Sequence, residues 1–176
     1  MKPTCVRITL LLFLSGFLTG THLHAQANPI YQIEANIVYH FTKYVNWPDQ
    51  DQPGDFVIGV IGNSPAYDEM MKLMDTRTAY GKRITIKKFP ANSAGFACQI
   101  LFITEEARAC LKRVAGETAA LPVLIVSEGA GQARKGASID LALSDEHLKL
   151  EINKTNIERH KLEIASELLE LGTIVN

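Results

Sequence analysis

Histidines, cysteines and paired carboxylates are the residues of this chain whose side chains could serve catalysis or metal binding. His40, His147 and His160 are widely spaced and never share one helical turn, whereas a metal site needs its ligands gathered. The pairs Glu105-Glu106 and Asp145-Glu146 fall at an expected helix start and an expected hairpin tip. No nucleophile elbow, dinucleotide-binding glycine motif or Walker motif occurs. The sequence therefore predicts no catalytic residue, no cofactor-binding residue and no metal ligand.

Cys98 and Cys110 are the only thiols after residue 27 and are the candidates for redox chemistry. We expect Cys98 at the start of a strand and Cys110 in the helix that follows. A strand rises about 3.3 Å per residue and a helix about 1.5 Å, so the helix has not returned to the level of Cys98 at Cys110. A disulfide needs Cα atoms about 4.4 to 6.8 Å apart. We predict two unpaired thiols, either both buried and inert or with one exposed for redox sensing or intermolecular pairing.

The densest aromatic region of the chain ends in Tyr44, Trp47 and Pro48. Tyr44 lies on the apolar face of a predicted helix, and Pro48 must stop that helix. One interpretation is core packing at the helix end. The other is an exposed patch of these three residues that binds a partner protein, because Trp and Tyr bury a large area at low entropic cost. The sequence leaves both interpretations open.

The turn Gly62-Asn63-Ser64-Pro65 follows the first predicted buried strand, the position at which open α/β sheets bind ligands. Helix capping is the ordinary role of such a turn. The alternative is a crevice between this turn and the glycine-rich loop 129–136. That alternative predicts a domain that binds a small molecule.

Residues 1–27 have the pattern of a cleaved secretory signal peptide. Two basic residues precede an apolar run from Ile8 to Leu18, and Ala25-Gln26-Ala27 supplies the small residues of a cleavage site. The run is shorter than the about 20 apolar residues that span a membrane. We therefore expect export and one mature domain of residues 28–176.

The composition is that of a globular domain, with 47% hydrophobic and 21% charged residues among 176. Removing residues 1–27 leaves 16 basic and 19 acidic side chains, a net charge of about −3. A protein that binds nucleic acid instead carries a clustered excess of Lys and Arg. The charge argues against nucleic acid as a partner.

Buried strands alternate with helices along the mature chain. Continuous apolar runs predict strands at 56–62, 99–103 and 123–126 that are covered on both faces. The periodicity of the other segments predicts helices at 29–46, 67–74 and 105–114, a strand at 83–89 and an antiparallel hairpin at 138–152. This order is typical of βαβ units. We predict an α/β three-layer sandwich with a mostly parallel sheet and the antiparallel hairpin at one edge.

The end of the chain reads as one closing amphipathic helix. Ile157, Ile164 and Leu168 fall on one helical face. His160 falls on the polar side of this helix, where we expect an ordinary solvated or helix-flanking histidine.

Several of these segments together resemble the YfiR family. The similarity rests on residues 41–48, on Ile58-Gly59-Val60-Ile61-Gly62, on Cys98-Gln99-Ile100-Leu101-Phe102-Ile103, on Leu150-Glu151-Ile152-Asn153 and on residues 162–171. The resemblance covers essentially the whole mature chain. Order and spacing make it specific.

The resemblance implies a periplasmic α/β regulator without catalysis, which represses a membrane-bound diguanylate cyclase and is sequestered by an outer-membrane lipoprotein. A histidine kinase is another membrane sensor that fits as a partner, and a homodimer is compatible with such a role. The resemblance also implies a redox response through cysteines, for which Cys98 has a family counterpart. The leading hypothesis is a regulatory binding protein, and the alternative is a periplasmic domain that binds a small molecule.

Overall fold

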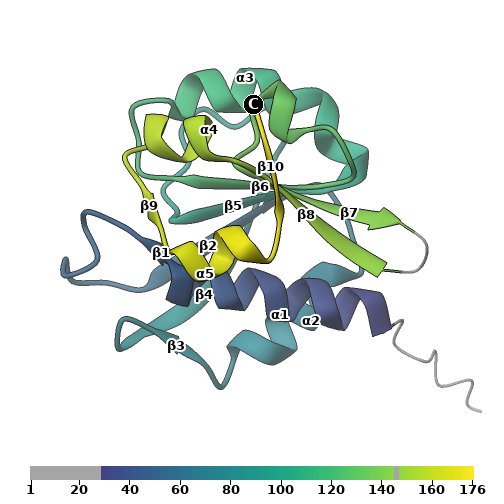
Figure 1. Ribbon diagram of the computed structural model, residues 1–176. Helices are drawn as coiled ribbons and strands as arrows, with labels where there is room; N and C mark the ends of the chain where they lie inside the picture. The colour runs from purple at the N-terminus through teal and green to yellow at the C-terminus, as the bar shows by residue number, and fades with distance from the viewer. Residues whose placement is uncertain (1–28, 145–146) are drawn as a thin grey trace, which may run out of the picture.

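The computed structural model describes residues 29–144 and 147–176. The predicted signal peptide, 1–27, and the hairpin tip at Asp145-Glu146 lie outside the described residues. The described residues form three layers, and the middle layer is an eight-stranded sheet of order β10-β8-β7-β6-β5-β2-β4-β3 (Figure 1). The strands are β2 (Phe56–Ile61), β3 (Thr78–Ala79), β4 (Lys82–Phe89), β5 (Ile100–Ile103), β6 (Leu124–Glu128), β7 (Ile139–Ser144), β8 (His147–Asn153) and β10 (Thr173–Val175).

The middle of the sheet is parallel. β4, β2, β5, β6 and β7 run in one direction, β7 pairs antiparallel with β8, and β3 pairs antiparallel with β4. The three-residue β10 adds a parallel strand outside β8. The chain passes from β2 to β4 on one side and then returns to β5 on the other side of β2. The two strands β2 and β5 therefore flank the point at which strand order reverses.

Side chains of the central strands alternate between two apolar layers. Ile100 and Phe102 of β5 pack with one cluster of buried residues, and Leu101 and Ile103 pack with the other. β6 shows the same division. Helices α1 (Pro29–Tyr44) and α2 (Ala66–Met74) contribute to the first cluster, and α3 (Leu111–Thr118) contributes to the second. Figure 1 shows α1 and α2 on one side of the sheet and α3 on the other.

The predicted α/β sandwich is confirmed, including the burial of its three central strands on both faces. The hairpin of β7 and β8 lies at one end of the sheet, with β10 outside it. The predicted helix at 105–114 is only partly correct, because it begins as the 3-10 helix η1 (Glu105–Cys110) and continues as α3 to Thr118.

The prediction of one closing helix is wrong. The segment divides into α4 (Lys154–Arg159), β9 (Glu163–Ile164), α5 (Ser166–Glu170) and β10. Lys161 has a φ of 57°, which ends the first helix. β9 then pairs antiparallel with β1 (Val45–Asn46), the two-residue strand that follows α1. Tertiary pairing thus replaces the helix that the apolar spacing predicts.

The placement of His160 on the polar side of a helix is also wrong, because the side chain is 2% exposed. Of the two expected roles, His160 has the helix-flanking one. It follows α4, and its Nδ1 lies 3.0 Å from the carbonyl oxygen of Leu121. Burial lowers the pKa of this imidazole. A turn after α4 therefore directs His160 inward.

Candidate functional site

A crevice of about 790 Å³ lies at the carboxyl ends of the parallel strands. It begins between β2 and β5, where strand order reverses, the place at which α/β sheets bind ligands. Its volume is within the range of small-molecule sites. The lining residues come from α1, the turn after β2, η1, the end of β6 with the loop that follows it, and β7: Ile30, Tyr31, Glu34, Asn63, Ser64, Pro65, Glu105, Glu106, Arg108, Glu128, Gly129, Ala130, Leu141 and Leu143.

The turn after β2 is held tightly against η1. Gly62 has a φ of +91°, and a Cβ there would lie 2.0 Å from Thr104 Oγ1, so only glycine fits. Asn63 donates its backbone N–H to Glu106 Oε1 at 2.6 Å and its side-chain Nδ2–H to the same atom at 2.9 Å. The turn therefore forms a fixed wall of the crevice, and Glu106 is occupied in holding it.

Glu128, at the end of β6, joins two walls of the crevice. Its Oε1 accepts a hydrogen bond from the Ser64 hydroxyl, and its Oε2 accepts the backbone N–H of Glu105 at 2.9 Å. Burial raises the pKa of Glu128, although both hydrogen bonds favour the ionised form. Both oxygens of this carboxylate thus have donors within the protein.

Glu34 differs from the other acids of the crevice, because it is 6% exposed and its Oε2 has no hydrogen-bond partner. Burial, the charge of Glu128 and a hydrogen bond to Glu128 together raise its pKa to about 8. Near neutral pH, Glu34 is therefore mostly protonated. Its O–H can donate a hydrogen bond to the Glu128 carboxyl group.

Glu34 is not among the residues predicted for this site, because the apolar spacing of Ile30, Ile33 and Ile37 predicts that Ile33 lies on the buried face of the helix. Ile33 is 48% exposed, and the buried face consists of Glu34, Ala35, Val38, Phe41 and Thr42. A signal was present: Glu34 precedes Val38 by four residues and Phe41 by seven, the spacing of one helical face. An acid in that register indicates either a paired core carboxyl or a binding group.

The glycine-rich loop after β6 is fixed by a buried polar network. Asp140 Oδ2 accepts the backbone N–H of Ala133 at 2.6 Å. Asn156 donates its side-chain Nδ2–H to the carbonyls of Ala133 and Ala137 at 3.0 and 2.8 Å. Gly131 donates its N–H to Glu151 Oε2 at 3.2 Å. The loop 129–136, which the sequence predicts as one side of a ligand crevice, lines the crevice at Gly129. The hydrogen bonds of Asp140, Asn156 and Glu151 hold this loop in place.

Trp47 and Cys98, two of the residues selected from the sequence, lie beside one small cavity of about 60 Å³ at the opposite end of the sheet. Trp47 is 3% exposed and belongs to the core, which favours the first of its two interpretations. Its neighbour Pro48 is exposed and Tyr44 is half-buried. Cys110 lies apart from this region, at the end of η1.

Cys98 and Cys110 are both free, Cys98 buried and Cys110 half-buried. Burial raises the pKa of Cys98 to about 12 and also raises that of Cys110. Since the thiolate is the reactive form, both environments suppress reaction. These surroundings favour inert thiols over redox sensors.

We predict that the protein purified without reductant contains no disulfide between Cys98 and Cys110. Alkylation of the folded chain should modify Cys98 slowly or not at all, because its thiol is buried and protonated, whereas alkylation after denaturation without reductant should modify both cysteines. Intact-mass spectrometry counts the added groups. A mass lower by two hydrogens with no alkylation of the unfolded chain would contradict this prediction.

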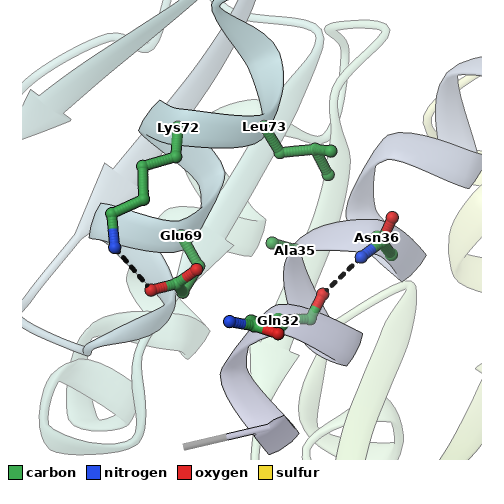
Figure 2. A pocket seen from close by; sticks show the side chains of 6 residues that line it. All are labelled: Gln32, Ala35, Asn36, Glu69, Lys72 and Leu73. Atoms are coloured by element: carbon green, nitrogen blue, oxygen red, sulfur yellow. Dashed lines mark hydrogen bonds and ion pairs between the residues drawn. The ribbon is translucent and has the colours of Figure 1, made fainter. Parts of the chain in front are cut away.

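A second hollow, of about 240 Å³, lies between α1 and α2. Figure 2 shows Gln32, Ala35 and Asn36 from α1 facing Glu69, Lys72 and Leu73 from α2. Glu69 already forms an ion pair with Lys72 at 2.8 Å, and Asn36 Nδ2–H donates to the Gln32 carbonyl at 2.7 Å. The two charged groups of this hollow already neutralise each other, so it is a weaker candidate than the crevice.

The fold is an α/β sandwich whose largely parallel sheet presents polar side chains and a crevice at the carboxyl ends of its strands. A family model described as YfiR/HmsC-like matches residues 31–173, and the chain belongs to that family. No curated protein matches the chain. Membership supports, at family level, a periplasmic regulator of diguanylate cyclase signalling rather than an enzyme. It also implies interaction with a membrane signalling protein in general.

Proposed function

We propose that this chain is exported, loses residues 1–27, and acts as a single periplasmic domain of residues 28–176 that regulates one membrane-bound sensor. The family match over residues 31–173 carries the proposal. The sensor is of the diguanylate cyclase type, with a histidine kinase as the other candidate. An outer-membrane lipoprotein that sequesters the regulator and a homodimeric state complete the proposal. In the described ranges, no helix has the length and apolar character needed to cross a membrane.

We place the sensor-binding surface around Tyr44 and Pro48, with Trp47 beneath it as support. The Tyr44 ring stacks on His40 at 6.1 Å between centroids. The Tyr44 carbonyl accepts the N–H of Ala165 at 2.8 Å, next to the pairing of β1 with β9. A surface that is already rigid loses little entropy on binding. Exposed Pro48 and half-buried Tyr44 therefore offer a preformed apolar contact.

Purification of the tagged full-length protein from membranes tests this proposal. We expect recovery of one inner-membrane sensor by the wild type and at least a tenfold weaker recovery by Pro48→Asp, because a new charge would be buried against the partner. The matched control is Ala109→Asp, which adds the same charge at an exposed position of η1, at the opposite end of β5. It should recover the sensor normally.

Two outcomes would contradict the proposal. Recovery of no membrane protein by the wild type would remove the regulatory role, and melting-temperature shifts with metabolites would then favour the small-molecule alternative. Equal loss of the sensor in Pro48→Asp and Ala109→Asp would remove the assigned surface. Thermal melts of both variants must match the wild type for the comparison to count.

A further inference from the structure

Acids predominate among the charged side chains of the crevice at the strand ends, and the proposed regulation of a membrane protein gives these acids no role. Four of its lining side chains are acids, Glu34, Glu105, Glu106 and Glu128, and its one lining base is Arg108. Arg108 already pairs with Glu105 at 3.1 Å. The charge left over in the crevice is negative, which attracts a cation.

The buried end of the crevice has an unfilled acceptor. Glu34 Oε2 has no partner although the residue is 94% buried, and such atoms are nearly always hydrogen-bonded in folded proteins. Glu128, beside it, uses both its oxygens for Ser64 and Glu105 but retains lone pairs for a further donor. An ammonium placed between the two carboxyl groups would take the place of the proton that Glu34 donates to Glu128, and it would also supply a donor for Glu34 Oε2.

The shape and lining of the crevice select among cations. Within the described residues, no three acidic, histidine or cysteine side chains converge to hold a metal ion. The walls also carry the aliphatic side chains of Ile30, Leu141 and Leu143, which offer no ligands to a metal but suit a hydrocarbon chain. An ammonium group carried on an aliphatic chain fits both parts of the lining.

We propose that the crevice binds a small aliphatic amine or diamine, with one ammonium group seated between Glu34 and Glu128 and the carbon chain along the apolar wall. An ammonium has three N–H donors, enough for Glu34 Oε2 and the free lone pairs of Glu128. The proposal is independent of the sensor and of the surface around Pro48. Its failure would leave the membrane purification unaffected.

Binding of such an amine should release one proton. Glu34 is mostly protonated near neutral pH, and the positive charge of an ammonium seated beside it lowers its pKa, so that Glu34 ionises and releases its proton. The charged or titratable groups that face Glu34 across the crevice are Glu128 from β6 and Glu105, Glu106 and Arg108 from η1. Glu34 is the one of these acids for which both burial and Glu128 raise the pKa well into the neutral range.

Isothermal titration of the purified protein with cadaverine tests the proposal. At physiological ionic strength we expect saturable binding. As the pH increases towards 8, the affinity should rise about tenfold per pH unit, and above pH 8 it should stay constant, as the release of one proton requires. Titrations near pH 7 in two buffers of different ionisation enthalpy should give about one proton released per bound amine. The diol with the same carbon chain should not bind, because it carries no charge.

Glu34→Gln and Glu163→Gln form the matched pair of variants. Glu34→Gln keeps the side-chain shape but cannot ionise, so we expect at least tenfold weaker binding and no proton release. Glu163 is exposed on β9, away from the crevice, and its variant should bind as the wild type does. Absence of binding by the wild type at pH 8.5, equal binding by Glu34→Gln, or binding without proton release would each overturn the proposal. Far-UV circular dichroism confirms that both variants are folded.

Discussion

Trp47→Ala is expected to lower the free energy of unfolding by about 3 to 5 kcal/mol. The side chain is 3% exposed and meets Phe56 edge-on at 5.2 Å between ring centroids. Its Nε1–H donates to the carbonyl oxygen of Gln99 at 3.1 Å, next to the start of β5. Truncation removes this packing and leaves the carbonyl without that donor. Urea unfolding followed by circular dichroism measures the loss, because the chain has no other tryptophan for fluorescence.

Two further variants separate packing from partner binding at this position. Trp47→Phe keeps an aromatic ring but removes the donor, so it should cost less than the alanine variant and still fold. Pro48→Ala, at an exposed site, should change stability by no more than about 0.5 kcal/mol. An alanine variant at Trp47 with wild-type stability and weakened recovery of the sensor would show that Trp47 is a docking residue, contrary to its burial.

The central strands could be predicted because burial on both faces leaves a plain record in the sequence. Residues 56–61, 100–103 and 124–126 are continuous apolar runs, and each run lies between the two helical layers of the fold. In such strands the residue type does not depend on which face a side chain occupies. The order of strands and helices then indicated the parallel sheet.

The end of the chain could not be predicted from periodicity. Its apolar residues are spaced as in a helix, but β9 gains backbone hydrogen bonds from β1, a strand more than a hundred residues earlier. The positive φ of Lys161, an unusual conformation for a lysine, produces the turn that makes this pairing possible. Long-range pairing of two-residue strands has no local pattern by which to find it.

The location of the candidate site in the fold could be predicted from the sequence, but only some of its lining residues could. The turn at Gly62-Asn63-Ser64 and the loop at Gly129 stand at strand ends, and the structure brings both to one crevice. Glu34 was not predicted, because the observed helix is turned about its axis relative to the orientation that the apolar spacing predicts. In the observed orientation Ile33 is exposed and Glu34 is buried. A small error in the assigned helical face therefore concealed the most perturbed carboxyl group of the site.

That carboxyl group should control the pH dependence of stability. The pKa of Glu34 is about 8 in the folded protein and near its ordinary value of 4.5 in the unfolded chain, so between these values the folded state binds the proton more tightly. Unfolding releases that proton, and stability therefore falls as pH rises from about 5 to 9. The shift corresponds to at most about 5 kcal/mol. We expect a loss of about 2 to 4 kcal/mol, because Glu128 shares the proton.

Glu34→Gln should remove most of this loss, because glutamine stays neutral at every pH. We expect the variant to be about 2 to 4 kcal/mol more stable than the wild type at pH 9 and within about 1 kcal/mol of it at pH 5. Asp140, whose pKa burial raises to about 6, contributes in the same direction, and His160, whose pKa burial lowers, contributes in the opposite direction. Both groups are the same in the variant, so the difference between variant and wild type isolates Glu34. Urea unfolding at each pH, with Glu163→Gln as the exposed control, measures the difference. A wild type whose stability is constant or rises between pH 6 and 9 would show that Glu34 and Glu128 do not share a proton in the folded protein.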